Sequence, residues 1–525
     1  MLGGSLLGDV VTLVRRGVVG PALPHRAAGQ LASILTYGVG LFGELRQAAK
    51  RSPGALAVID EERGESSFAE LLAQVEITTE VLRGFGVRAG DRVGLLARNH
   101  VGAVEAMAAV DALGADLVLL NTGLTAAQAA VVASEQRLSL VVHDDDLADV
   151  VAGLGEVTRV SETELAEGVA HTRRPLFVRP ERGGRTIVLT SGTTGSPKGA
   201  TRRTPPGIGP LAAILHTIPF NTGERMLVSA PIFHTWGLAA LQLALGIRAT
   251  VVLQRRFDPA ATRAALEEHG IHAHVAVPVM LHRMMELPSD PSARRRRSLR
   301  VTATSGSALP GGLATAYMNE YGDVLYNLYG STEASWVSIA GPADLRRSPQ
   351  TAGRPPRGTT VRILDGAGRE VREGTVGRIF CGNALVFEGY TSGGEEKEFV
   401  DGLVSTGDLG YVSDGLLFVE GREDDMIVSG GENVYPAEVT AALDRLPGVR
   451  ECAVVGVGDE RFGQRLAAFV VRAPGASTTE ADVIAHCKAT VSRHAVPRDV
   501  HFVAELPRNA TGKVLSRELL ALVDG

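Results

Sequence analysis

The chain reads Leu189-Thr190-Ser191-Gly192-Thr193-Thr194-Gly195-Ser196-Pro197-Lys198-Gly199 at the end of an apolar, strand-like run that begins at Thr186. Its glycines let successive backbone N–H groups turn toward one anion, its hydroxyls add hydrogen-bond donors, and its lysine supplies a compact positive charge. These properties favour a binding site for a polyphosphate. The order differs from that of a Walker A loop, because Pro197 precedes the lysine and no Ser or Thr follows it. A surface turn of similar composition is the alternative.

Lysine is rare in this chain. Of the 53 lysines and arginines, five are lysines, and two of these, Lys198 and Lys513, stand in Gly/Thr-rich segments. An ammonium group on a flexible stem can enter a narrow site and contact several oxygens of a reacting phosphate, whereas a guanidinium group is a broad planar fork. We therefore interpret both lysines as candidates for contact with phosphate, with placement by chance as the alternative.

The composition is that of a large globular protein. At 525 residues, with 45% hydrophobic and 21% charged residues, the chain is long enough for at least two domains. The formal net charge of −6 argues against nucleic-acid binding, which usually requires a surplus of basic residues. The three cysteines are scattered and lack metal-type spacing, which predicts a reducing, cytoplasmic location and no structural zinc.

Residues 1–45 form an apolar N-terminal extension that we expect to be helical. Asp9 and the pair Arg15-Arg16 interrupt the apolar runs, so no transmembrane span is predicted. Apolar residues recur at helical spacing at Leu31, Ile34, Leu35, Phe42 and Leu45. We favour docking of this face on the rest of the protein, and peripheral contact with a membrane surface is the alternative.

Strand-like and helix-like segments alternate from about residue 50 onward. Two such series, at residues 93–142 and 226–277, predict two doubly wound α/β layers with buried parallel strands. Residues 352–420 are rich in β-hairpin signals, among them Asp414-Gly415. After residues 421–424 the pattern returns to α+β on a smaller scale, so we place a domain boundary there.

Several further motifs follow one another along the chain. They are Pro231–Gly237, Ser305–Ala308, Tyr329–Glu333, Ser405–Asp408, Gly421–Asp424 and the segment around Lys513. Their order resembles that of the adenylate-forming superfamily, which includes acyl-CoA synthetases, amino-acid adenylation domains and luciferases. The resemblance covers roughly residues 50–525. It implies an α/β fold with two doubly wound subdomains and a distorted β-barrel in an AMP-binding N-terminal domain (46–421), followed by a small mobile α+β C-terminal domain (422–525).

The resemblance implies a site for ATP and Mg²⁺. The residues that match the phosphate-binding set are Thr190, Ser191, Gly192, Thr193, Thr194, Lys198 and Thr332. Those that match the adenine and ribose set are Gly306, Ser307, Ala308, Tyr329, Asp408 and Arg422. Small residues allow close approach of adenine, the tyrosine ring offers a stacking face, and one carboxylate can accept from both ribose hydroxyls. Glu333 matches the Mg²⁺ carboxylate, since a hard cation that bridges phosphates needs an anionic oxygen beside it.

The C-terminal part supplies three further matches. Lys513 resembles the lysine that bridges the substrate carboxylate and the α-phosphate, and Asp424 resembles the hinge residue about which the small domain turns. Gly430 and Gly431 resemble the segment that lines the pantetheine tunnel for coenzyme A, the co-substrate. Without the resemblance, a surface lysine and a charged linker are the alternatives.

His234 indicates the subclass. Amino-acid-activating members commonly carry Phe-Asp at this segment, whereas this chain has Phe233-His234, as many fatty-acid and aryl-CoA ligases do. We assign His234 a catalytic role together with Lys513, and a core histidine is the alternative. The apolar residues expected near the acid pocket are Ile232, Trp236, Leu238, Trp336 and Val337.

The resemblance implies an AMP-forming fatty-acid–CoA ligase of the actinobacterial type. The acid carboxylate attacks ATP to give acyl-AMP and pyrophosphate, and the thiol of coenzyme A then displaces AMP. An aryl-acid–CoA ligase or a fatty-acyl-AMP ligase is the alternative within the superfamily. A nucleotide-binding protein without turnover is the alternative from a different class.

Overall fold

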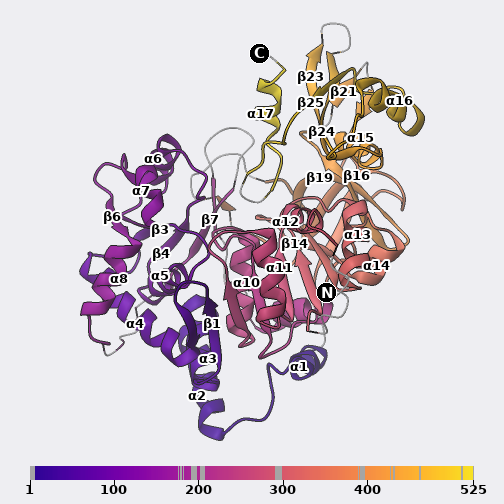
Figure 1. The fold of residues 1–525 in the computed structure, drawn as a ribbon. Coiled ribbons are helices and arrows are strands. Elements are labelled where there is room, and N and C mark those ends of the chain that lie inside the picture. The colour runs from indigo at the N-terminus through magenta and orange to yellow at the C-terminus, as the bar shows by residue number, and fades with distance from the viewer. Residues whose placement is uncertain are drawn as a thin grey trace.

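The computed structural model describes residues 6–175, 177, 180, 182–190, 198–201, 207–289, 298–387, 389–390, 397–425, 427–429, 432–459, 463–509 and 512–523. Side chains are described at these positions except 190, 198–201, 390, 428–429, 432–433 and 463. Within this part of the chain the strands form four sheets, three from residues 56–422 and one from residues 427–502. Figure 1 shows the fourth sheet as part of a small unit above the larger one. A mixed α/β fold with a large N-terminal and a small C-terminal domain is thereby confirmed.

The first α/β layer is built on a seven-stranded sheet. Its elements are β3 (Arg92–Leu96), α5 (Val101–Ala112), β4 (Asp116–Leu119), α6 (Ala126–Glu135), β5 (Leu140–His143), a 3₁₀ turn (Asp145–Leu147), α7 (Ala148–Val151), β6 (Thr158–Ser161), α8 (Glu162–His171), β7 (Thr186–Thr190), β8 (Lys198–Thr201) and β17 (Gly389–Tyr390). The strand order is β17-β8-β7-β4-β3-β5-β6, and β3 to β7 run parallel. Every residue of β4 and β5 is buried, as expected of parallel strands covered on both faces. The first predicted series is confirmed.

The second α/β layer is built on an eight-stranded sheet. Its elements are β1 (Leu56–Asp60), β2 (Gly64–Ser67), α4 (Phe68–Gly84), α9 (Gly209–Thr217), β9 (Arg225–Val228), α10 (Thr235–Gly246), β10 (Thr250–Leu253), α11 (Pro259–Glu268), β11 (Ala273–Ala276), α12 (Pro278–Met285), β12 (Val301–Thr304), α13 (Gly311–Tyr321), β13 (Leu325–Ser331), β14 (Ser335–Ala340) and α14 (Pro342–Arg347). The strands β9, β10 and β11 pair in parallel, which confirms the second predicted series. At the start of α11, the Asp258 carboxylate accepts a hydrogen bond from the backbone N–H of Ala261, and Pro259 occupies the first turn.

The predicted phosphate loop connects β7 and β8. These strands pair antiparallel, with Thr190 opposite Lys198. Both ends of the loop are therefore held together at one end of a hairpin, whose strand β7 is itself paired in parallel with β4. Residues 191–197 lie outside the described residues, so the predictions for Ser191, Gly192, Thr193 and Thr194 stay predictions. The same holds for the side chains of Thr190 and Lys198.

A five-stranded antiparallel sheet stands where the distorted barrel was predicted. Its strands are β15 (Thr360–Leu364), β16 (Gly377–Gly382), β18 (Phe399–Val400), β19 (Leu403–Ser413) and β20 (Leu416–Arg422). Asp414 and Gly415 connect β19 to β20 with φ values of 52° and 70°. Two positive φ values in a two-residue hairpin loop define the turn that an Asp-Gly pair favours. The predicted hairpin at this site is thus confirmed.

The C-terminal unit has its own sheet. Its elements are β21 (Ile427–Ser429), β22 (Glu432–Val434), α15 (Pro436–Leu443), β23 (Val449–Asp459), β24 (Gly463–Arg472), α16 (Glu480–Thr490), β25 (Asp499–Phe502) and α17 (Ser516–Ala521). Apolar residues of α15, α16 and the sheet form a separate hydrophobic core. We keep the division between residues 421 and 422 as a proposal: β20 of the antiparallel sheet ends at Arg422, and the next strand, β21, belongs to the C-terminal sheet.

Three helices precede β1. They are α1 (Leu6–Arg15), α2 (Pro24–Tyr37) and α3 (Leu41–Arg51), and Figure 1 shows α1 and α2 at the end of the molecule far from the C-terminal unit. The N-terminus of α3 is capped from α5, because the backbone N–H of Phe42 donates to the Asp111 carboxylate at 2.9 Å. Gly40 precedes α3, and a Cβ there would lie 2.5 Å from that carboxylate. Among the described residues, no helix combines the length and apolarity that a bilayer span requires.

The predicted docking face of the extension is divided between two environments. Phe42 and Leu45 on α3 are buried in the main core. Leu31 and Leu35 on α2 are exposed instead. The helical spacing does not distinguish these two halves, because a turn at residues 38–40 separates α2 from α3 and gives each helix its own orientation.

Candidate active site

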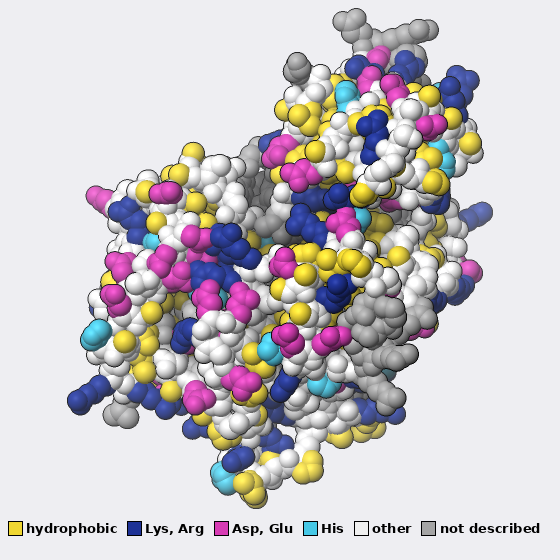
Figure 2. All heavy atoms as spheres, in the orientation of Figure 1, with side chains coloured by type: hydrophobic (Ala, Val, Ile, Leu, Met, Phe, Trp, Pro, Cys, Tyr) yellow, Lys and Arg dark blue, Asp and Glu magenta, His cyan; other side chains and the backbone are white. Residues whose placement is uncertain are grey.

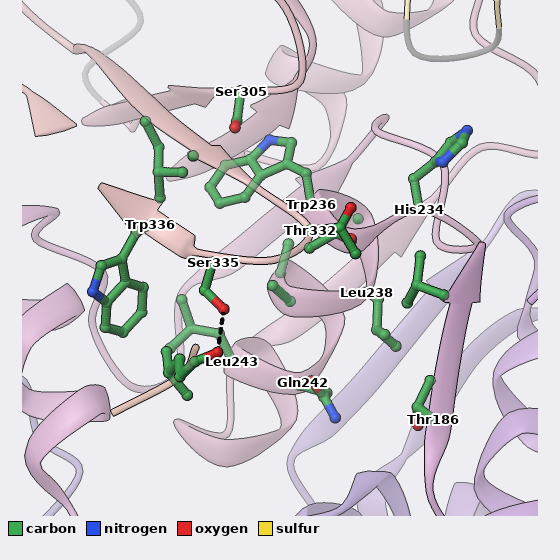
Figure 3. A pocket seen from close by; sticks show the side chains of 18 of the residues that line it. Thr186, His234, Trp236, Leu238, Gln242, Leu243, Ser305, Thr332, Ser335 and Trp336 are labelled. Atoms are coloured by element: carbon green, nitrogen blue, oxygen red, sulfur yellow. Dashed lines mark hydrogen bonds between the residues drawn. The ribbon is translucent and has the colours of Figure 1, made fainter. Parts of the chain in front are cut away.

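A cavity of about 1830 Å³, here called the central cavity, is lined by both α/β layers, the antiparallel sheet and the C-terminal unit. One part is polar and contains Thr332, Glu333 and Lys513. Another part follows α10 from His234 to Gly246 and is largely apolar. Figure 3 shows the side chains of Trp236, Trp336 and Leu238 around this apolar part. The cavity therefore joins a charged region to a hydrophobic one.

The carboxylate predicted to hold Mg²⁺ lies on a tight turn. Thr332 and Glu333 connect β13 to β14, and both line the central cavity. The turn is fixed at its base, because the Glu333 carbonyl accepts from the backbone N–H of Phe387 at 2.8 Å and the Ser335 hydroxyl donates to the Leu385 carbonyl at 2.8 Å (Figure 3). Gly330 sits where a Cβ would lie 1.9 Å from the Ser335 carbonyl oxygen. The close approach of the two strands therefore requires glycine at this position.

Asp408, predicted to bind the ribose, lies on β19 directly opposite Arg422 on β20. The Tyr329 hydroxyl donates to its carboxylate, and the Arg422 guanidinium lies 3.7 Å from the other carboxylate oxygen. The backbone N–H of Asp408 donates to the Thr406 hydroxyl at 3.1 Å. Burial raises the pKa of Asp408, while Tyr329, Arg422 and Lys397 act to lower it. The carboxylate is held in one orientation from two sides.

Lys513 reaches the central cavity from a closed loop of the C-terminal unit. The Asn509 side chain accepts from the backbone N–H of Lys513, and the Asn509 carbonyl accepts from that of Gly512, both at 2.9 Å. Gly512 has a φ of +79°, and a Cβ there would lie 2.4 Å from the Val279 side chain on α12. Glycine therefore meets two requirements at once, a left-handed backbone and close contact with the large domain. Both requirements help to place the neighbouring Lys513.

Two ion pairs lie where the large and small units meet. Arg450, at the start of β23, pairs with Glu286 after α12 at 2.6 Å. Arg422 pairs with Asp424 at 3.0 Å, on the segment that leaves β20 for the C-terminal unit. The Arg422 pair is the main influence that lowers the pKa of Asp424 against the effect of burial. Asp424 is thus held at the domain junction, and its role as a hinge stays a prediction.

His234 stands at the N-cap of α10 and lines the central cavity. Burial lowers the pKa of its imidazole to about 4, so the ring is neutral near pH 7. Within the described residues, its buried Nε2 has no hydrogen-bond partner. The adjacent Phe233 is buried, with the two ring centroids 4.6 Å apart. A neutral imidazole with a free nitrogen can bind a polar group of a substrate, but it cannot supply a fixed positive charge.

The apolar part of the cavity contains three of the five residues expected there. Trp236, Leu238 and Trp336 line it, whereas Ile232 and Val337 are fully buried in the surrounding core. Trp336 and Val337 are adjacent on β14, yet one lines the cavity and the other is in the core, and Ile232 is buried in the turn before α10. Proximity in sequence therefore does not decide which residue lines the site. The indole N–H of Trp236 donates to the Ala276 carbonyl at 3.0 Å, and that of Trp336 to the Thr359 hydroxyl at 3.0 Å. These bonds fix both ring planes.

The structure brings together a majority of the described site residues. The predicted residues that line the central cavity are His234, Gly306, Thr332, Glu333, Arg422, Asp424 and Lys513. Four other predicted residues do not line it: Ser307, Ala308, Tyr329 and Asp408. Ser307 and Ala308 follow Gly306 in the sequence, while Asp408 lies opposite Arg422 and accepts a hydrogen bond from Tyr329. Gly430 and Gly431 lie outside the described residues, so their prediction as a tunnel for coenzyme A is unchanged.

Sequence reasoning missed two residues of the polar region. Lys397 lines the cavity, and its ammonium would lie 3.6 Å from a Cβ placed at Gly407. Asn509 closes the loop that presents Lys513. The rarity of lysine in the chain was a signal that could have identified Lys397. Asn509 stands four residues before Lys513 in the same Gly/Thr-rich segment, and its side chain is of the type that closes turns.

Glu44 lies at the far end of the central cavity, beside Gly246 at the end of α10. Its carboxylate accepts from the Gln47 amide at 3.1 Å, and Gln47 in turn accepts from Gln30 at 2.7 Å. Burial raises the pKa of Glu44 from 4.5 to about 7. Because the folded state then binds more protons than the unfolded state, stability falls as the pH rises from about 4.5 to about 7.

We expect the Glu44→Gln variant to be more stable than the wild type at pH 8, by up to about 3 kcal/mol, and to lose this advantage below pH 4.5. The reason is that the amide does not ionise in the buried site. Urea unfolding at pH 4, 6 and 8 measures the difference. Glu135→Gln, at an exposed position on α6, is the control and should leave the pH dependence unchanged. A constant difference between Glu44→Gln and wild type at all three pH values would contradict the explanation.

Comparison with known proteins identifies the family. Residues 45–391 match the model of the AMP-binding enzyme family, and residues 438–513 match that of the AMP-binding enzyme C-terminal domain. The chain therefore belongs to the AMP-binding enzyme family, the adenylate-forming group that the order of its motifs resembled.

Two relatives and one solved structure illustrate the similarity. A feruloyl-CoA synthase from Amycolatopsis sp. is 34% identical over 90% of this chain and 96% of its own. A 2-succinylbenzoate–CoA ligase from Geobacillus kaustophilus is 33% identical over 91% of this chain and 97% of its own. The crystal structure of ATP-bound MatB from Rhodopseudomonas palustris superposes with a TM-score of 0.83 at 27% identity, covering 92% of this chain and 98% of that one.

Proposed function

We propose that this protein is an AMP-forming acid–CoA ligase. The observation that carries the proposal is that Lys513, from the C-terminal unit, lines the same cavity as Glu333 and the apolar acid pocket at Trp236. A carboxylate held in the pocket attacks the α-phosphorus of ATP, and the bond to pyrophosphate breaks to give acyl-AMP. The thiol of coenzyme A then attacks the acyl carbon, and AMP leaves. The proteins named above, a CoA synthase, a CoA ligase and an ATP-bound enzyme, support this assignment.

The residues of the polar region fit these roles. The ammonium of Lys513 would bind the incoming carboxylate and the α-phosphate together, which aligns them and stabilises the charge of the transition state. The carboxylate of Glu333 is the kind of oxygen donor that Mg²⁺ prefers, and the hydroxyl of Thr332 can donate to a phosphate oxygen. When bound, Mg²⁺ would neutralise phosphate charge at this position. Asp408, oriented by Tyr329 and Arg422, would bind the ribose.

For the acid, an aryl acid is the first candidate. Both relatives reported above are named for acids that carry an aromatic ring. Trp236 and Trp336 present fixed indole rings to the apolar part of the cavity, as Figure 3 shows. Aromatic rings stack favourably on such surfaces, with about 0.5–1.5 kcal/mol beyond the burial of area. We therefore propose an aryl acid as the preferred substrate, in place of the fatty acid predicted from the sequence.

A fatty acid is the second candidate, favoured by the shape of the cavity. The cavity extends beyond the tryptophans along α10 as far as Gly246. A helix of this length spans about 18 Å, which exceeds the length of a simple aromatic acid. Leu211 and Ile214 on α9, together with Leu243 on α10, add apolar lining along this path.

A panel of acids distinguishes the candidates. Thioester formation from ATP and coenzyme A would be measured with ferulate, 2-succinylbenzoate, benzoate, octanoate, palmitate and a free amino acid. We expect kcat/KM to be highest for a hydrophobic acid and the amino acid to be refused, because burying an unpaired ammonium is costly. A preference for octanoate and palmitate over every aromatic acid would select the second candidate. Absence of AMP formation with all acids would refute the ligase assignment.

A further inference from the structure

The first two helices carry a concentration of exposed apolar side chains. Of the fifteen large hydrophobic residues that are exposed in the described part of the chain, nine lie between residues 6 and 35. They are Leu6, Leu7, Val10, Val11, Val14, Val19, Leu23, Leu31 and Leu35. Figure 2 shows apolar side chains at the lower edge of the molecule, where α1 and α2 lie in Figure 1. Apolar residues scattered singly need no explanation, but nine exposed ones on two neighbouring helices and the loop between them indicate a candidate binding surface.

Each of the two helices has one attached face and one free face. On α2, the exposed positions Leu23, Leu31 and Leu35 follow one another at multiples of four residues, with Leu23 at the N-cap. On α1, Leu7, Val11 and Val14 are exposed at helical spacing, while Leu13 is buried. The opposite face of each helix contacts the rest of the protein. The exposed apolar stripe is therefore a feature of the folded structure.

Two arginine side chains hold the N-terminal extension in place, because each donates hydrogen bonds to backbone carbonyls of the extension. Arg248 donates to the carbonyls of Gly17 and Val18 at 3.0 Å each. Arg51 donates to the carbonyls of Gly20 and Pro21 at 2.7 and 2.9 Å. The loop between α1 and α2 is therefore attached to the body at two points.

This surface is continuous with the central cavity. Val19 and Leu31 line the cavity and are also about half exposed to solvent. The cavity thus reaches the surface between α2 and the loop that precedes it, at the end away from Lys513. A hydrophobic acid that entered here would pass along α10 toward His234 and the polar region.

The charge and composition of the surface favour a lipid over a protein. Between residues 6 and 43 the chain has three arginines and one acid, Asp9, whereas the whole protein has a formal net charge of −6. The exposed apolar residues are all Leu and Val. Short amphipathic helices with arginines beside an apolar stripe are suited to the boundary between headgroups and acyl chains.

We propose that α1 and α2 rest on an anionic lipid surface and admit a hydrophobic acid from it into the central cavity. The binding part of this proposal is independent of the enzymatic activity, whereas the entry of the acid rests on the proposed function. The leucines insert between the lipids, and the side chains of Arg15 and Arg26 lie at the headgroups. The acid then moves from the lipid into a cavity mouth that combines the apolar residues Val19, Leu31 and Ile34 with the polar residues Gln30, Glu44 and Arg51.

The test uses the full chain and sedimentation with phosphatidylglycerol-containing vesicles, compared with phosphatidylcholine vesicles. The double variant Leu7→Glu/Leu35→Glu changes two residues that are 75% and 77% exposed and do not line the cavity. We expect wild type to bind the anionic vesicles, and the double variant to bind them at least tenfold more weakly, about the loss for two leucines that no longer insert. Val131→Glu, on the exposed face of α6, is the matched control and should bind like wild type.

Activity separates this proposal from the proposed function. With a soluble acid and no vesicles, the double variant should form thioester at the wild-type rate; with the best acid of the panel held in vesicles, its rate should fall at least tenfold.

Equal vesicle binding by wild type and double variant would overturn the proposal, as would no binding by wild type. A dimer that the double variant converts to monomer in light scattering would show instead that the surface binds a second copy. Vesicle binding without any thioester formation would support the lipid-binding surface and refute the ligase assignment.

Discussion

Lys513→Ala should reduce the formation of acyl-AMP by about 100-fold or more, since loss of one preorganised charge at the transition state costs roughly 3 kcal/mol or more. Pyrophosphate release with the best acid of the panel measures this step. Formation of thioester from supplied acyl-AMP should continue at a rate near that of wild type, because Lys513 is assigned to the first half-reaction. The loop that holds Lys513 is closed through backbone groups and Asn509, so removal of the ammonium leaves the loop bonds intact.

Lys488→Ala is the matched control for this experiment. Lys488 is on α16 of the same C-terminal unit and is exposed, so both half-reactions should keep their rates. An equal loss in the two half-reactions of Lys513→Ala would contradict its assignment. The hinge prediction can be tested with the same assays, since Asp424→Pro fixes φ at the junction and should slow the two half-reactions unequally.

Asp408→Ala should lower kcat/KM for ATP by on the order of 100-fold. Two hydrogen bonds from ribose hydroxyls to a charged acceptor would be lost, at roughly 1.5 kcal/mol or more each. The Tyr329 hydroxyl and the Arg422 guanidinium would also lose their shared partner. The measurement is the initial rate of pyrophosphate release as a function of ATP concentration, with the acid saturating.

Two variants refine the interpretation of Asp408. Asp408→Asn keeps the shape and can still accept from Tyr329, so its loss should be smaller than that of Asp408→Ala. Tyr329→Phe removes the hydroxyl that orients the carboxylate and should raise the KM for ATP more than it lowers kcat. An unchanged KM for ATP in Asp408→Ala would show that the ribose binds elsewhere.

Much of the fold could be predicted from local sequence patterns. The parallel strands β3, β4 and β5 appear as short apolar runs because both faces of a central parallel strand are buried. The start of α11 could be predicted from Asp258-Pro259 and the β19–β20 turn from Asp414-Gly415, since each pair satisfies a local backbone requirement. Such signals need no knowledge of distant contacts.

The sequence by itself also determined the family, because its motifs occur in a fixed order with characteristic residue types. Only the tertiary structure decided which side chains share a cavity. Lys513 lies 180 residues beyond Glu333 in the sequence, and the two line one cavity because Gly512 packs on Val279 across the domain junction. Ile232 and Val337 point into the core, while Trp236 and Trp336 line the cavity. Burial of Leu45 and exposure of Leu35 within one apolar pattern were likewise decided by how α2 and α3 pack, since hydrophobic periodicity gives the faces of a helix but not what covers them.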